Sequence, residues 1–286
     1  MAKQVLLLAA LVGSVVGKVS KEPLFNWSKG LNPNNVLHAI NCGANEYHTD
    51  VNGVKWMPDI GSTGGFKSSE GSNHRWIMPD TEVYQTERWS NENFSYMIPF
   101  DANEDGDYVL VLKFSEQYFS QSGEKVFDVK IGDKVVLDGL DPLAMAGAKL
   151  LPYDAFIEIK TKRGEVYING GKVKGAVKKE SLLVTFVKGP ADNPKINAIA
   201  LVSGGLKNTH KASFDKYQAT LHAINNEKAE ARAKEEALFN EDLYDFEDSI
   251  DGRGLFNQML AHTYLFEALT IVSMLVFFRV IPNSTK

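Results

Sequence analysis

The sequence predicts an all-β fold, a jelly-roll-type antiparallel β-sandwich, followed by a helical and acidic segment. Short β-rich runs occupy residues 34 to 204, and clusters of Gly, Asn, Asp and Pro separate them. The connections are too short to hold crossover helices, so neighbouring strands must be mainly antiparallel. The chain has 286 residues, of which 44% are hydrophobic, and this apolar content is enough to bury a core. One such domain, predicted over residues 30–204, has an ordinary size for this fold.

The expected strands follow one another along this part of the chain. Their residue ranges are 36–41, 82–89, 94–100, 108–114, 125–131, 134–139, 155–161, 165–169, 181–189 and 195–203. In the fifth run, Phe127, Val129 and Ile131 alternate with polar residues, which is the period of a half-buried strand. Gly132 and Asp133 then form a two-residue hairpin turn to the next run.

Residues 1–17 are typical of a secretory signal peptide. Lys3 precedes the apolar run VLLLAALVGSVV, which is too short to span a bilayer. Val15 and Gly17 supply the small residues expected before a cleavage site. The alternative for this segment is a buried N-terminal strand.

The chain after the β-rich part changes in composition. Residues 205–254 are predicted to form a helical and acidic luminal spacer, with the helix over 212–238. Residues 225–251 hold ten acidic and three basic residues, a net charge of −7 in a chain whose total is −5. The acidic part reads as a solvated spacer, and a docking peptide is the alternative.

Residues 255–281 are expected to form one transmembrane segment, with 282–286 as a short cytosolic tail. Its run from Leu255 to Phe278 is mostly apolar but is interrupted by Glu267 and closed by basic Arg279. A packed amphipathic helix is the alternative. Because the acidic stretch precedes the span and basic residues follow it, the body of the protein should be luminal. This is the layout of a single-pass type I membrane protein. Asn26 and Asn93 are then candidate glycosylation sites.

Composition also excludes several functional classes. A single cysteine, Cys42, excludes an internal disulfide and a cysteine-rich zinc module. The acidic balance argues against nucleic-acid binding. The histidines show no metal-ligand spacing, so neither a metal nor another cofactor is expected. No G-x-S-x-G nucleophile motif is present, and although a two-carboxylate glycosidase stays open, nothing in the sequence points to an enzyme.

Aromatic residues next to turns are the strongest functional signal. Tyr118 and Phe119 follow a strand directly, and successive strand side chains face opposite sides, so one of the two rings should be displayed. Tyr84 opens the run YQTERW, and Asp192 stands in a turn that is fixed by Asn193-Pro194. Aromatic faces stack on sugar rings, and a carboxylate accepts hydrogen bonds from hydroxyls. A sugar platform therefore competes here with ordinary core and turn roles.

At these residues the sequence resembles the malectin family, the membrane-anchored lectins of the endoplasmic reticulum. The matching segments are HAINCG (38–43), VYQTERW (83–89), GDYVLVLKFSEQYFSQSGEKVFDVKI (106–131) and FVKGPADNPKINAIAL (186–201). The resemblance implies a non-catalytic lectin for the glucose-glucose disaccharide unit of diglucosylated high-mannose N-glycans, acting in early glycoprotein quality control. It also implies association with the oligosaccharyltransferase subunit ribophorin I.

The resemblance also assigns the binding residues. It implies that Tyr84, Tyr118 and Phe119 stack on the sugars and that Asp192 holds hydroxyls. One further tyrosine of the family, in an S-D-Y-G stretch, is missing from this sequence. Phe66 and Trp76 are both candidates to replace it. The alternative function is a structural subunit of an oligosaccharyltransferase-associated membrane complex whose sugar binding is altered or lost.

Overall fold

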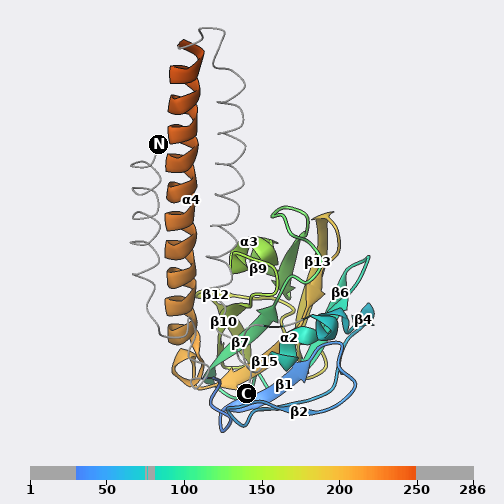
Figure 1. The fold of residues 1–286 in the computed structure, drawn as a ribbon. Helices are drawn as coiled ribbons and strands as arrows, with labels where there is room; N and C mark the ends of the chain where they lie inside the picture. The colour runs from blue at the N-terminus through green and yellow to red at the C-terminus, as the bar shows by residue number, and fades with distance from the viewer. Residues whose placement is uncertain (1–29, 75, 77–80, 249–286) are drawn as a thin grey trace. The chain divides into compact units, whose positions relative to one another are not determined.

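Two antiparallel sheets form the body of the protein (Figure 1). The computed structural model describes residues 30–74, 76 and 81–248. The larger sheet has the strand order β1 (Val36–Asn41), β15 (Ala198–Ser203), β7 (Gly106–Phe114), β10 (Tyr153–Lys162), β11 (Glu165–Ile168) and β12 (Gly171–Lys172). The second sheet has the order β6 (Phe94–Pro99), β13 (Ser181–Ala191), β8 (Val126–Ile131) and β9 (Lys134–Leu140).

Smaller elements complete the structure. A three-stranded sheet has the order β14 (Lys195–Ile196), β5 (Glu87–Trp89) and β4 (Phe66–Ser68), and β2 (His48–Thr49) pairs with β3 (Lys55–Trp56). The helices are η1 (Glu70–Asn73), α2 (Glu82–Gln85), α3 (Pro142–Ala146), η2 (Leu206–Asn208) and α4 (Lys211–Asp248).

The main core lies between the two large sheets. Alternate residues of β7 and β8, such as Leu112 and Phe127, point into it and are fully buried. The opposite face of β7 is buried too, because Val109 and Val111 pack in a second cluster with Trp56. Burial on both faces explains why the sequence of β7 is almost continuously apolar.

The predicted antiparallel β-sandwich is confirmed, since every pairing between named strands is antiparallel. The prediction of one strand over 82–89 is wrong in its first half, where α2 is helical. Val83 and Tyr84 are consecutive and both buried, which an alternating strand with one solvent face does not allow. The jelly-roll type stays a prediction.

The predicted helix over 212–238 is confirmed and is longer than expected, because α4 continues to Asp248. Its first turns belong to the compact unit that extends to Asn225, and its later turns belong to a second unit. Phe214, Tyr217 and Leu221 are buried on one face, where they pack against Tyr153 and Phe156. The folded domain therefore continues past the predicted boundary at residue 204.

Among residues 30–248, as far as they are described, no helix is long and apolar enough to cross a membrane. The predicted signal peptide (1–17), the predicted span (255–281) and the tail (282–286) all lie outside the described residues.

Replacing Phe214 with Ala tests the docking of the helix on the sandwich. Because the ring is almost fully buried among aromatic neighbours, Phe214→Ala should lower the free energy of unfolding by about 3–5 kcal/mol. Lys216→Ala, at an exposed position of the same helix, is the matched control. Chemical denaturation of the full chain measures both, and equal effects of the two substitutions would contradict the packing.

Candidate functional site

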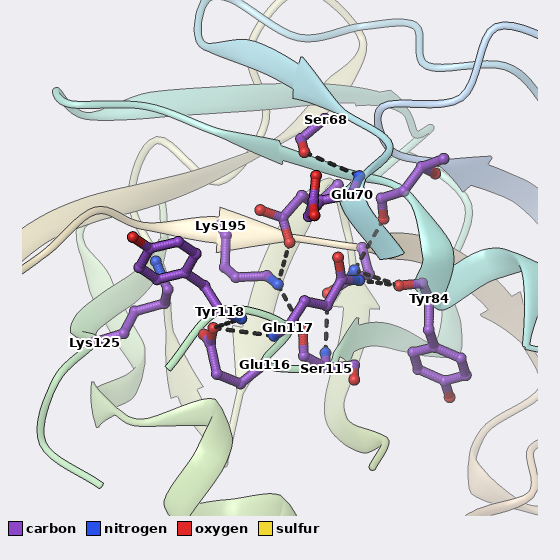
Figure 2. Close-up of polar contacts among 12 residues, drawn as sticks. Ser68, Glu70, Tyr84, Ser115, Glu116, Gln117, Tyr118, Lys125 and Lys195 are labelled. Carbon is purple, nitrogen blue, oxygen red and sulfur yellow. Dashed lines mark hydrogen bonds and ion pairs between the residues drawn. The ribbon is translucent and has the colours of Figure 1, made fainter. Parts of the chain in front are cut away.

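The loop after β7 displays an aromatic residue directly after three buried polar residues. Ser115, Glu116 and Gln117 are buried, whereas Tyr118 is 77% exposed. The Glu116 Oε1 atom accepts hydrogen bonds from the backbone N–H groups of Gln117 and Tyr118, at 3.0 and 2.7 Å (Figure 2). It also accepts one from the backbone N–H of Phe119 at 3.0 Å. A buried carboxylate needs such donors, and satisfying it fixes the path of the loop. The exposure of Tyr118 thus follows from the burial of Glu116.

Phe119 supports the ring of Tyr118. The two ring centroids lie 5.0 Å apart with an interplanar angle of 86°, the edge-to-face arrangement that aromatic pairs favour. Phe119 is half-buried, and the Nζ atom of Lys125 lies 5.4 Å from its ring centroid. The structure therefore confirms the sequence-based expectation that at least one of the two adjacent rings is displayed.

Asp192 lies at the same site. It follows β13 with a backbone φ of 51°. The Lys125 ammonium forms an ion pair with its Oδ2 atom and donates to the Oδ1 atom of Asn193 at 2.9 Å. Lys125 thus joins Phe119 to Asp192, and we call Tyr118, Phe119, Lys125, Asp192 and Asn193 the aromatic-carboxylate site.

The structure does not place Tyr84 where it could stack on a sugar, the role that the family resemblance implies for it. Its side chain is 1% exposed, and its hydroxyl donates to Asp154 Oδ1 at 2.7 Å. Figure 2 shows its ring directed away from Tyr118. Its backbone carbonyl, however, accepts a hydrogen bond from the Gln117 side-chain amide. In this structure the ring of Tyr84 offers no surface for stacking, and the residue contacts the aromatic loop through its backbone.

The two candidates for the missing tyrosine differ in exposure. Phe66 lies on β4, is 58% exposed and contacts Trp89 at 5.1 Å between ring centroids. Trp76 is half-buried, donates from Nε1 to the carbonyl of Gly71 at 2.8 Å and lies beside the ring of Tyr84. Of the two, Phe66 has the more accessible ring.

Sequence reasoning missed the buried cations of this region. The Lys195 ammonium is buried, forms an ion pair with Glu87 and donates to the carbonyl of Ser115 at 2.6 Å. Lys125 was missed as well. A lysine in or beside a strand is ordinary in a sequence and does not indicate burial. Only the strand register shows which groups these lysines face.

A second charged cluster lies on the outer face of the larger sheet. Lys113 and Asp154 are direct partners across β7 and β10, and their ion pair measures 2.5 Å. His210 Nε2 lies 2.6 Å from the same carboxylate oxygen, and the Tyr84 hydroxyl binds the other oxygen. Burial acts to raise the pKa of Asp154, but Lys113 and His210 hold that pKa down to about 2. The four groups connect the start of α4 to the helix that carries Tyr84.

Asn93 is exposed, and its Oδ1 atom accepts a hydrogen bond from the backbone N–H of Lys188 at 2.8 Å. Asn26, the other candidate glycosylation site, lies outside the described residues. Within the part of the chain that the structure describes, no group of three or more His, Cys, Asp or Glu side chains is arranged to hold a metal ion.

Glu116 is the residue to test for the shape of the loop. Glu116→Ala removes the acceptor of three backbone N–H groups, so it should cost about 1–3 kcal/mol of unfolding free energy and speed amide exchange over 115–121. Glu116→Gln keeps one acceptor and should have a smaller effect. Glu158→Ala, at an exposed position of β10, is the control. Unchanged exchange in Glu116→Ala, measured by mass spectrometry, would contradict the assigned role.

The buried cluster predicts a pH dependence of stability. Burial lowers the pKa of His210, as does Lys113, against the opposite effects of Asp154 and Asp50. Below the ordinary pKa of about 6.5, the unfolded chain binds a proton that the folded chain does not. The free energy of unfolding should therefore fall as the pH is lowered from 7.5 to 5.5, by at most about 1.4 kcal/mol per pH unit from this residue.

His210→Gln should flatten that pH dependence, because the glutamine does not titrate. Denaturant titrations at several pH values measure the slopes, and His222→Gln, at an exposed position of α4, is the control. Parallel curves for the wild type and His210→Gln would contradict the assignment.

Comparison with known proteins places these residues in a family. The family model described as the malectin domain matches residues 36–199. Malectin of Homo sapiens is 37% identical over 183 residues, which is 63% of this chain and 60% of the human protein. Malectin-B of Xenopus laevis is 36% identical over 201 residues, 69% of this chain and 68% of that protein.

A weaker likeness is found among solved structures. The ANX1 ectodomain from Arabidopsis thaliana has a TM-score of 0.48 and 19% identity, over 60% of this chain and 49% of that one. The malectin-domain model covers more than half of the chain and all of the aromatic-carboxylate site. The chain belongs to the malectin domain family.

Proposed function

We propose that this chain is a non-catalytic lectin that binds glucose-glucose disaccharide units. The observation that carries the proposal is a tyrosine ring displayed to solvent on a loop that the buried Glu116 carboxylate holds through its Oε1 atom, with the Asp192 carboxylate close by. Membership of the malectin domain family supports the same class of function. The stretch 106–131, which carries Tyr118 and Phe119, is also the most specific part of the family resemblance.

The chemistry of the site suits a neutral sugar. The exposed ring of Tyr118 can stack on the apolar C–H face of a glucose ring. Phe119 holds the Tyr118 ring in place. Asp192 supplies carboxylate oxygens that accept hydrogen bonds from neighbouring hydroxyls. Phe66 is the better candidate for a further stacking contact, because its ring is exposed.

Such a site should bind weakly. Each sugar hydroxyl exchanges water for a protein partner at little net gain, so a dissociation constant of roughly micromolar to millimolar is expected. Confinement at a membrane surface would raise the effective concentration of lectin and glycoprotein. The membrane span predicted from the sequence would supply that confinement.

The positions of the carboxylates favour recognition over hydrolysis. A glycosidase needs two carboxyl groups flanking the scissile bond, one of them acting as an acid. Asp192 is paired with Lys125, and Glu116 is buried with its Oε1 atom bound by backbone donors. The proposed activity is therefore binding without cleavage, and release of glucose from a disaccharide by the purified chain would refute it.

The cellular context of the proposal comes from the family resemblance. We infer that the lectin domain is luminal in the endoplasmic reticulum, that its ligands are diglucosylated high-mannose N-glycans and that it serves early glycoprotein quality control. Ribophorin I of the oligosaccharyltransferase is the proposed protein partner. Co-precipitation with ribophorin I, with and without removal of N-glycans, would test whether that association depends on sugar.

Titration of the full chain with maltose, nigerose and a diglucosylated N-glycan tests the proposal. We expect saturable binding of at least one of them. Tyr118→Ala and Asp192→Asn should each weaken it about tenfold or more, because each removes a direct contact. Isothermal titration calorimetry measures the affinity, and thermal unfolding confirms that each variant is folded.

Matched controls lie at the opposite end of the larger sheet. Asp107 forms a surface ion pair with Lys160, and Lys160 pairs across the strands with Tyr167. Asp107→Asn and Tyr167→Ala should therefore leave binding unchanged. If the folded wild type binds none of the three sugars, the lectin proposal fails and a structural role in a membrane complex becomes the better account.

A further inference from the structure

A buried lysine connects the two halves of the aromatic-carboxylate site. Lys125 lies immediately before β8, and its side chain is 7% exposed. We propose that Lys125 is the positioning residue of the sugar site, which fixes the Asp192 carboxylate and the Phe119 ring in the arrangement that a ligand meets. The inference rests on the proposed function and adds to it a residue that does not itself touch the ligand.

Strand register places this lysine. Val126 of β8 pairs with Ala191 of β13, and because the strands are antiparallel, the preceding residue Lys125 faces Asp192. The register shifts between Lys188 and Ala191, and this irregularity lets β13 turn toward the site. Gly189 makes the close approach there possible, since a Cβ at this position would lie 2.1 Å from the carbonyl oxygen of Val126.

The three protons of the ammonium group have three acceptors. They are Asp192 Oδ2, Asn193 Oδ1 at 2.9 Å and the Asn193 carbonyl at 3.3 Å. The same charge lies over the Phe119 ring. With its donors occupied, Lys125 acts on a ligand through the two residues that it holds.

The Asp192 turn needs such a restraint. Its φ of 51° lies in the left-handed region, which a residue with a Cβ adopts only at an energetic cost. Two lysines bind this turn, because Lys188 donates from Nζ to the Asp192 carbonyl while Lys125 binds the carboxylate. The Oδ1 atom of Asp192 accepts only a longer contact, 3.2 Å, from the Asn193 amide, so it retains lone pairs for sugar hydroxyls.

Replacement by methionine tests the inference in the full chain. Lys125→Met keeps most of the side-chain volume and removes the charge, so amide exchange should rise over residues 115–121 and 188–194. Nigerose or maltose binding should weaken about tenfold, since a charge-assisted contact to the binding carboxylate is lost. Lys125→Arg restores the charge and should recover part of the affinity.

Two comparisons separate positioning from a general structural role. Lys172 forms a more exposed ion pair with Glu165 of β11, at the opposite end of the larger sheet, so Lys172→Met controls for the loss of a lysine charge and should change neither exchange nor affinity. In the Asp192→Asn background, Lys125→Met should weaken binding by a clearly smaller factor than in the wild type, because the carboxylate charge that Lys125 binds is already absent. Equal factors in the two backgrounds would overturn action through Asp192.

The two readouts distinguish the possible failures. If the wild type binds sugar and Lys125→Met changes neither binding nor exchange, the inference is overturned and the proposed function stands. If the wild type binds no sugar and Lys125→Met raises exchange in both segments, the proposed function fails and the positioning role stands. If there is no sugar binding and no change in exchange, both are overturned.

Discussion

The shape of the candidate site depends on one buried carboxylate. Glu116 lies two residues after the central strand β7 and is buried. A charge at that depth is tolerated only with donors around it, and here the donors are the next three backbone N–H groups. The loop therefore curls around Glu116, and the residue that it turns outward is Tyr118. An exposed aromatic side chain is in this way tied to the interior of the protein.

The same strand explains why the larger sheet has two buried faces. Its inner face completes the sandwich core, and its outer face carries Lys113, whose charge is compensated by Asp154, a carboxylate that also contacts His210. This cluster holds the Tyr84 hydroxyl, while the Tyr84 carbonyl binds Gln117 in the aromatic loop. A continuous set of contacts thus runs from the first turn of α4 to the proposed ligand site. The start of α4 is consequently connected to the aromatic loop of the proposed ligand site.

Sequence patterns predicted the sandwich because strand alternation and turn residues are local signals, as in the run ending at Ile131 and the turn that follows it. They also predicted that Tyr118 or Phe119 would be exposed to solvent, since successive side chains of an extended chain face opposite sides. They failed at α2, where two consecutive buried residues need a helical turn over the outer face of the sheet. They failed for Lys125 and for the burial of Tyr84, because both depend on register and on layers that meet only in three dimensions.

The central claim is that a ligand meets Tyr118 and not the ring of Tyr84. Fluorine NMR of the full chain carrying 3-fluorotyrosine tests it most directly, with resonances assigned from Tyr118→Phe and Tyr84→Phe. On addition of nigerose, the account predicts a saturable shift of the Tyr118 resonance and little change at Tyr84, which is buried and bonded to Asp154. Saturable sugar binding that leaves the Tyr118 resonance unmoved, or that shifts Tyr84 most strongly, would contradict it.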